Sequence, residues 1–298
     1  MPVLPDAGTE QGQRKGIVGF LGLEQVGHDL FHGWCHDGIP SRAFGGQVAA
    51  QALAAAGRTV PDGRMAHSVH CHFLRTGDTA HPFVYEVERI RDGSSYLTRR
   101  ATARQGGDVV FTLTASFKRP ETAEDRQPSM PVTPDPGMLP DLYEIWAKSS
   151  PEDVAQAEFR HAFDMRYVPG PAEPSTPGVM EQKLWMRATE RLSNDPLLHC
   201  SALTYASDLF LAPTTALALE PPRMLRTEPA SVFLTSLDHA IWFHRPFRAD
   251  AWLLFSQRSP SASDGRGLAF AEVWNLDGRL IAHVVQEAVV RPLRSRSS

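Results

Sequence analysis

The sequence predicts an α+β fold built from two similar units in tandem, each with one central helix against a curved antiparallel sheet. Three observations support this: a Gly/Ala-rich helical segment at 44–56, a later block that repeats the order of helix and alternating strands, and a proline-rich stretch between them. Small side chains let a helix lie close inside a curved sheet. We therefore expect one long sheet that carries two central helices.

The first unit has a strand-poor start, and its helix at 44–56 is expected to end at Gly57. Strands follow in which apolar residues recur with period two, the pattern of a sheet with one buried face. The three apolar series are Val69, Cys71 and Phe73; Phe83, Tyr85 and Val87; and Val109, Phe111, Leu113, Ala115 and Phe117. Gly106 and Gly107 mark the hairpin before the last series.

The second unit begins near His161 and predicts a helix at 207–219, bent at Pro213. Its predicted strands cover 236–243, 252–257, 268–274 and 280–290, with a hairpin turn at Asp277 and Gly278. Arg75 and Arg245 each follow a phenylalanine by two residues. They place the offset between the units at about 170 residues.

The boundaries follow from these patterns. Residues 119–140 contain six prolines and predict a stiff linker. We divide the chain into a flexible N-terminus (1–16), a first unit (17–118), a linker and connector (119–160), a second unit (161–293) and a flexible tail (294–298). Residues 138–163 predict a helical or mixed segment, which either covers the mouth of an apolar tunnel or packs on the surface as a connector.

Composition excludes several classes of protein. The 30 Lys and Arg residues against 34 Asp and Glu residues leave no basic surplus for binding nucleic acid. Three cysteines without CxxC spacing predict neither disulfides nor a zinc site and fit a reducing cytosol. The first residues lack the apolar core of a signal peptide, and the apolar stretch 201–219 is broken by Asp208 and Pro213. We expect a cytoplasmic protein without a membrane span.

Three polar residues occur in the second unit only: Asp208, Ser236 and Gln286. Their counterparts in the first unit are the Gly45-Gly46 pair, Ala66 and Ala115, respectively. Each polar residue lies in an apolar context, and Asp208 is expected to open the second helix. A buried polar group without a partner costs roughly 1–3 kcal/mol. We therefore expect the three to satisfy one another or to share a ligand or a water molecule.

Each of these residues also has a purely structural interpretation. Asp208 could cap the start of a helix, a position that aspartate favours. Ser236 could be a small core residue, and the backbone could satisfy Gln286. Their joint restriction to one unit favours a functional role.

Five segments carry a resemblance to a known family. They are residues 20–24 (FLGLE), 44–47 (FGGQ), 205–209 (YASDL), 237–247 (LDHAIWFHRPF) and 285–291 (VQEAVVR). With them the chain resembles the acyl-CoA thioesterase II family from about residue 17 to residue 292. The long run at 237–247 is the most specific of these motifs.

This resemblance implies a double-hotdog fold, in which two hotdog repeats each wrap a curved sheet around a central helix. It implies hydrolysis of medium- to long-chain fatty acyl-CoA to free fatty acid and coenzyme A, without a cofactor or a metal. The family's catalytic Asp, Ser or Thr, and Gln fall by motif position on Asp208, Ser236 and Gln286. Thr235 competes with Ser236 if the register slips by one residue. Relatives assemble as dimers or tetramers, so a homo-oligomer is expected.

In the expected mechanism Asp208 accepts a proton from a water held by Ser236 and Gln286. Backbone N–H groups at a helix N-terminus would stabilise the oxyanion. The sequence contains no GxSxG, HExxH, Walker or GxGxxG motif that would indicate other chemistry.

Two alternatives stay open. Asp238 and His239 could form the acid/base pair of a hotdog enoyl-CoA hydratase, although a histidine on a strand is more often structural. A non-catalytic acyl-CoA binding protein on the same scaffold is the second alternative.

Overall fold

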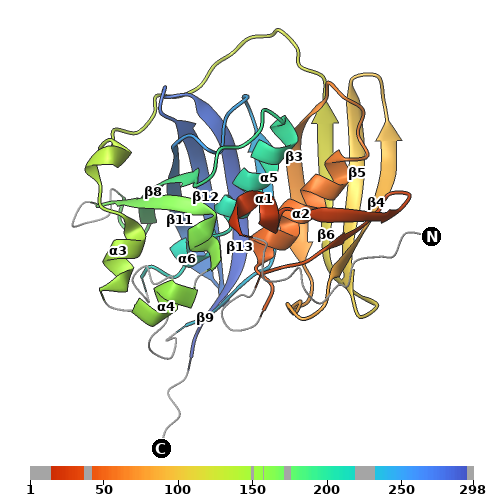
Figure 1. Cartoon of the computed structure of the whole chain (residues 1–298). Coiled ribbons are helices and arrows are strands. Elements are labelled where there is room, and N and C mark those ends of the chain that lie inside the picture. The colour runs from red at the N-terminus through yellow and green to blue at the C-terminus, as the bar shows by residue number, and fades with distance from the viewer. Residues whose placement is uncertain are drawn as a thin grey trace, which may run out of the picture.

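The computed structural model describes residues 15–36, 42–148, 151–156, 158–170, 176–218 and 232–293. These residues form one antiparallel sheet of 13 strands with the helices packed against it (Figure 1). The strand order is β1-β2-β4-β5-β6-β3-β10-β13-β12-β11-β8-β7, and β9 pairs with β13 off this path. This is the predicted double hotdog.

Along the main path of the sheet, which leaves out β9, the strands divide evenly about the central β3–β10 pair. The first half holds β1 Leu23–Gly27, β2 Leu30–Gly33, β3 Met65–Phe73, β4 Phe83–Asp92, β5 Tyr96–Gln105 and β6 Asp108–Lys118. The second half holds β7 Phe163–Val168, β8 Met180–Ala188, β9 Val232–Ser236, β10 Asp238–Phe243, β11 Leu253–Ser263, β12 Arg266–Asn275 and β13 Leu280–Pro292. Reading outward from the centre, β6, β5, β4, β2 and β1 are matched by β13, β12, β11, β8 and β7. β1, β2, β5, β7 and β8 were not predicted.

Helices α2 (Gly45–Gly57) and α5 (Pro196–Ser207) are the two central helices. They run antiparallel and very close together. A Cβ atom at Gly46 would lie 2.7 Å from the Tyr205 carbonyl oxygen, and one at Gly57 would lie 2.4 Å from the Leu197 side chain. The start of α2 therefore meets the end of α5. The small side chains along α2, predicted at 44–56, permit this approach.

The helix predicted at 207–219 is wrong. The central helix of the second half is α5, which ends at Ser207 and begins where Asp195 accepts a hydrogen bond from the Leu197 N–H and Pro196 takes the first position. Beyond it the chain forms only the short α6 (Leu211–Thr214), and residue 219 lies outside the described residues. Because α5 is buried on nearly every side, its apolar residues do not mark a single face.

The strand predicted at 236–243 is split at Leu237 into β9 and β10. In the first half β3 has a bulge at the matching place, between Ala66 and Ser68. The pairing registers also agree: Ser236 lies opposite Ala288, as Ala66 lies opposite Phe117. The offset predicted between the two units is therefore also the offset between structurally equivalent residues of these strands.

Between the halves, residues 119–135 contain no helix or strand and arch over the sheet in Figure 1. The arch is attached to the second half, where Gln127 donates to the Gly278 carbonyl (2.7 Å) and accepts from the Leu280 N–H (3.0 Å). After it come the short helices α3 (Leu142–Ala147) and α4 (Pro151–Gln156) and two 3-10 turns at Pro136–Met138 and Glu158–His161. The predicted mixed segment is thus helical in part.

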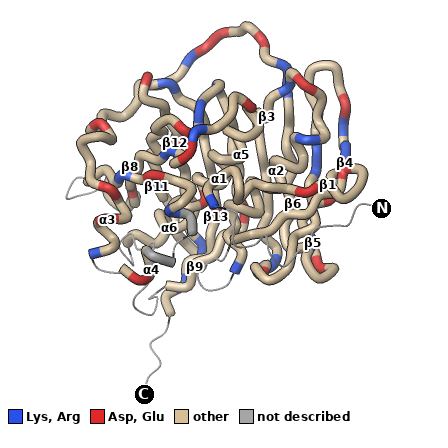
Figure 2. The backbone as a smooth tube through the Cα atoms, viewed as in Figure 1, with Lys and Arg blue, Asp and Glu red and all other residues tan. Residues whose placement is uncertain are grey.

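At the N-terminus, α1 (Gly16–Phe20) already begins at the last residue of the predicted flexible segment. Of the other predicted flexible residues, 1–14 and 294–298 lie outside the described part of the chain. Acidic and basic residues are interspersed along the backbone in Figure 2. Among the described residues, no helix has the length and apolar character needed to cross a membrane.

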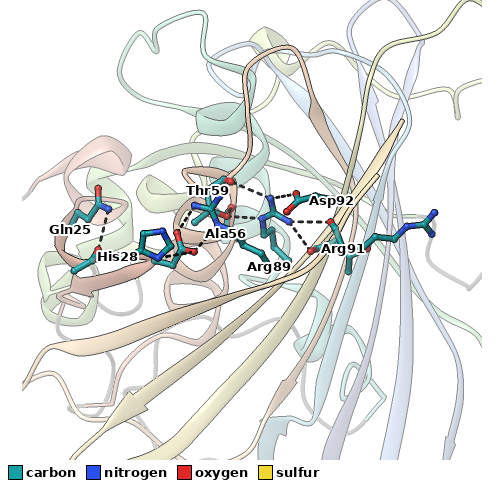
Figure 3. A network of polar contacts seen from close by, with 11 residues as sticks. Gln25, His28, Ala56, Thr59, Arg89, Arg91 and Asp92 are labelled. Carbon is teal, nitrogen blue, oxygen red and sulfur yellow. Dashed lines mark hydrogen bonds and ion pairs between the residues drawn. The ribbon is translucent and has the colours of Figure 1, made fainter. Parts of the chain in front are cut away.

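A fully buried arginine closes the C-terminal end of α2. Arg99 is 0% exposed, and its guanidinium donates to the Thr59 hydroxyl (2.8 Å), the Asp92 carboxylate (2.5 Å) and three backbone carbonyls (Figure 3 labels Thr59, Arg91 and Asp92). All five guanidinium donors are thereby used. Arg99 therefore anchors the end of α2 and has no donor left for a ligand.

Candidate active site between the central helices

The structure brings Asp208, Ser236 and Gln286 together. The Gln286 Nε2 donates to the Asp208 Oδ1 (2.6 Å) and to the Ser236 hydroxyl oxygen (2.9 Å). Asp208 follows α5, Ser236 ends β9 and Gln286 faces inward from β13. Asp208 is 8% exposed and Gln286 is 0% exposed. These groups bond to one another as expected, but the Gln286 Oε1 is buried without a hydrogen-bond partner among the described residues.

The place of Asp208 in its helix differs from the prediction. It does not open a helix and is not an N-cap; it is the C-cap of α5, with helical backbone angles (φ −85°, ψ −9°). Its carboxylate accepts a hydrogen bond from the backbone N–H of Gly46, in the first turn of α2. The positive end of the α2 dipole favours this negative charge. The cluster thus uses both halves of the chain, not the second half alone.

The glycine pair at the start of α2 is the neighbour of Asp208, not its counterpart. A Cβ atom at Gly45 would lie 3.0 Å from the Asp208 Oδ2 and 2.8 Å from the Phe73 ring. Only glycine lets the carboxylate lie this close to the helix backbone. Sequence comparison missed the contact because it depends on how the two halves pack.

Burial raises the pKa of Asp208 to about 6, although hydrogen bonds from Gln286, Gly46 and Ser236 lower it in part. A carboxyl group with this pKa is mostly ionised at neutral pH and still accepts a proton readily. Such a pKa suits a general base.

His239 is a buried neighbour of Asp208. Its Nε2 is 2.8 Å from the Ser207 hydroxyl oxygen and its Nδ1 is 4.0 Å from the Asp208 Oδ1. Burial lowers the pKa of His239 to about 4, so the imidazole is neutral at pH 7. The neighbouring Asp238 accepts from the Glu287 N–H (2.8 Å), and successive strand residues point to opposite faces. The structure therefore does not pair Asp238 with His239.

Thr235, the alternative to Ser236, is exposed, and it is Ser236 whose hydroxyl contacts Gln286. Next to the cluster lies a cavity of about 540 Å³, within the range of small-molecule sites. Asp208 and Ser236 line it with aromatic and aliphatic side chains, among them Phe44, Val48, Phe73, Phe83, Phe111 and Leu209. Its other charged lining residues are Arg42 and Arg75.

A second cavity, of about 510 Å³, lies at the start of α5 and is lined by Ala66, the counterpart of Ser236. The counterpart of Gln286 is Ala115, and the C-cap of α2, which matches Asp208, is Arg58. The fold therefore repeats the cavity in both halves, but the Asp, Ser and Gln side chains occur at only one of the two cavities.

The chain matches two family models, the acyl-CoA thioesterase N-terminal domain over residues 32–118 and the acyl-CoA thioesterase C-terminal domain over residues 131–290. Among curated proteins it is 34% identical to human acyl-coenzyme A thioesterase 8 (96% of this chain, 92% of the relative). It is 33% identical to acyl-CoA thioesterase 2 of Haemophilus influenzae (92% of this chain, 96% of the relative).

Among solved structures, an acyl-CoA thioesterase II from Mycobacterium marinum superposes with a TM-score of 0.78 at 38% identity (93% of this chain, 99% of the other). A hotdog-fold protein from Alicyclobacillus acidocaldarius superposes with a TM-score of 0.72 at 24% identity and supports the fold alone (92% of this chain, 97% of the other). The fold and the named relatives define a double-hotdog enzyme that cleaves thioesters. The chain belongs to the acyl-CoA thioesterase II family.

Proposed function

We propose that this protein hydrolyses medium- to long-chain fatty acyl-CoA to free fatty acid and coenzyme A, using a water molecule activated by Asp208. The observation that carries the proposal is the contact of Asp208 with Gln286 and Ser236 at the wall of an apolar cavity. The cavity offers the acyl chain an apolar environment, and the buried carboxylate offers the water a base.

In the proposed reaction Ser236 and Gln286 hold the water by hydrogen bonds: because both Nε2 hydrogens of Gln286 donate to Asp208 and Ser236, the water donates to the Gln286 Oε1, and it donates its other hydrogen to Asp208. As its oxygen attacks the thioester carbonyl carbon, its proton passes to the Asp208 carboxylate. The positive end of the α2 dipole at Gly45, which lines the cavity, stabilises the negative charge on the carbonyl oxygen. The tetrahedral intermediate then expels the CoA thiolate, which takes the proton back from Asp208 and leaves as the thiol.

The first test is thiol release from a series of acyl-CoAs, from octanoyl-CoA to stearoyl-CoA. We expect turnover by the wild type and a loss of about 10²–10⁴-fold in Asp208→Asn, the contribution typical of a general base. Asp264→Asn is the matched control, because Asp264 has the same side chain but is exposed in the β11–β12 hairpin, outside the cavity lining, with positive φ, which asparagine tolerates. It should keep full activity.

Two outcomes would contradict the proposal. Loss of enoyl absorbance from an enoyl-CoA without thiol release would indicate a hydratase. Acyl-CoA binding without either reaction would indicate a binding protein.

We further infer a cytoplasmic homo-oligomer, a dimer or a tetramer, from the resemblance to relatives that assemble in this way. Light scattering on the purified protein tests the assembly, and a monomer at micromolar concentration would contradict it. Cell fractionation tests the location.

A further inference from the structure

Arg75 and Arg245 occupy equivalent places in the two halves. Each lies two residues beyond the phenylalanine that ends the central strand of its half, Phe73 in β3 and Phe243 in β10. Arg75 Nη1 donates to the Val109 carbonyl (2.9 Å), and Arg245 Nη1 donates to the Leu280 carbonyl (2.6 Å). Both carbonyls lie at the start of the last strand of their half. The duplicated fold therefore fixes the same edge of both guanidinium groups.

The opposite edges of the two guanidinium groups, formed by Nε and Nη2, have different partners. In Arg245, the Nε donates to the Asp125 carboxylate (3.0 Å), and the Nη2 donates to the same carboxylate and to the Arg126 carbonyl (3.1 Å). Asp125 belongs to the linker between the halves, so its carboxylate neutralises Arg245, whose side chain is only 11% exposed. Arg75 is exposed, and within the described ranges no carboxylate pairs with it.

Arg75 and Arg245 also line different cavities, and Arg245 lines the one at the start of α5. Arg75 does not. It lines the hollow that contains Asp208 and Ser236, and Arg42 lines the same hollow. The two arginines lie on neighbouring segments, because Arg42 forms a β-bridge with Asp78 and Ala43 donates to the Gly77 carbonyl (3.0 Å). The Asp78 carboxylate accepts from the Ala80 and His81 N–H groups, at 2.9 and 3.0 Å. The cavity wall therefore holds two cations and one acid, Asp208.

CoA carries a diphosphate and a 3′-phosphate on the same molecule as the thioester. A guanidinium binds a phosphate through two parallel N–H groups, and the Nε and Nη2 edge that contacts Asp125 in Arg245 has no carboxylate partner in Arg75 among the described residues. We propose that Arg75, with Arg42 beside it, binds a phosphate of the CoA moiety. This inference rests on the proposed function and extends it to recognition of the substrate head group.

The test compares Arg75→Gln with Arg245→Gln on two thioesters with the same acyl chain, one of CoA and one of pantetheine, which lacks the phosphates. We expect Arg75→Gln to raise the KM for acyl-CoA by about tenfold, the loss of one charge-assisted contact to phosphate. The KM for acyl-pantetheine should not change. Arg245→Gln should leave both KM values unchanged, because Asp125 already occupies that guanidinium.

A third substrate, acyl-dephospho-CoA, locates the phosphate. A penalty for Arg75→Gln that persists with it assigns the contact to the diphosphate, and a penalty that disappears assigns it to the 3′-phosphate. If Arg75→Gln does not fold, Arg42→Gln and the salt dependence of the wild-type KM on acyl-CoA against acyl-pantetheine give the same comparison.

The proposal is overturned if the KM of Arg75→Gln for acyl-CoA stays unchanged. It is also overturned if the KM rises equally for acyl-pantetheine, or if Arg245→Gln shows the same rise. A wild type that hydrolyses neither thioester would contradict the proposed function instead, so the two failures are distinguishable.

Discussion

At the scale of single residues, Asp208 is an acid in a place that disfavours its charge. The three polar residues stand out in the sequence because the matching positions of the first unit are small or apolar. Sequence could not show that Asp208 ends a helix, or that its carboxylate meets the Gly46 N–H. That contact joins residues more than 160 positions apart, and no local pattern encodes it.

The raised pKa of Asp208 predicts that burial of its ionised carboxylate destabilises the folded wild type at neutral pH. The pKa rises from 3.8 to about 6 on folding, so the ionised carboxylate is disfavoured in the folded state. The cost is absent below pH 4, grows between pH 4 and 6, and is complete above pH 6. Asp208→Asn should therefore raise the free energy of unfolding at pH 8 by about 1–3 kcal/mol, less whatever the amide loses as an acceptor.

Urea unfolding of wild type and Asp208→Asn at pH 4 and pH 8 measures this difference. The gain should shrink toward zero at pH 4. Equal stability of the two proteins at pH 8, or a gain independent of pH, would show that burial does not penalise the Asp208 charge. The same variant is expected to be inactive, so it would be more stable than the wild type but would not catalyse the reaction.

At the scale of elements, the prediction succeeded for α2 and failed for α5. The glycines and alanines of α2, followed by Gly57, give clear boundaries in the sequence. The start signals of α5, Asp195 and Pro196, are equally present, but the apolar run continues past Ser207 and hides its end. Strand alternation in β6 and β13 was readable, because one face of each strand is buried and the other is not.

The close contact of α2 with α5 predicts the effect of Gly46→Ala. The new Cβ would lie 2.7 Å from the Tyr205 carbonyl oxygen, which is backbone and cannot rotate away. The start of α2 must then move from the end of α5, and the Gly46 N–H moves from Asp208. We expect a fall of at least about tenfold in kcat, since small misplacements at a reacting group are costly.

Gly63→Ala is the comparison for general glycine effects, because the open space around Gly63 isolates the backbone penalty of its positive φ. It should lower the melting temperature but leave the kcat of the folded protein unchanged. A Gly46→Ala variant with wild-type kcat would show that the separation of α2 and α5 does not control the site.

At the scale of the whole molecule, the halves are joined by the β3–β10 pair and by the packing of α2 against α5, as well as by the linker. The tandem organisation was readable because the proline-rich segment separates two similar patterns. The pairing of the halves through their central strands was expected only as one long sheet. The strand order could not be read, since pairing between distant strands leaves no local signature.

This arrangement predicts that the linker is dispensable once the protein has folded. A protease site inserted between residues 121 and 124 lies after β6 and before Asp125, which is fixed to the second half. Cleavage should leave the two fragments together on gel filtration with the activity of the uncut variant. Fragments that separate would show that the covalent connection, not the sheet, holds the halves in place.

The hydrogen bond from Gly46 to Asp208 also has a genetic consequence. Two copies of a duplicated segment ordinarily diverge independently, each under its own selection. Here the first copy supplies the backbone against which the acid of the second copy is positioned, so a substitution at Gly45 or Gly46 acts on a proposed catalytic acid encoded more than 160 codons downstream. Recombination that exchanges one copy between homologues must therefore preserve a matched pair.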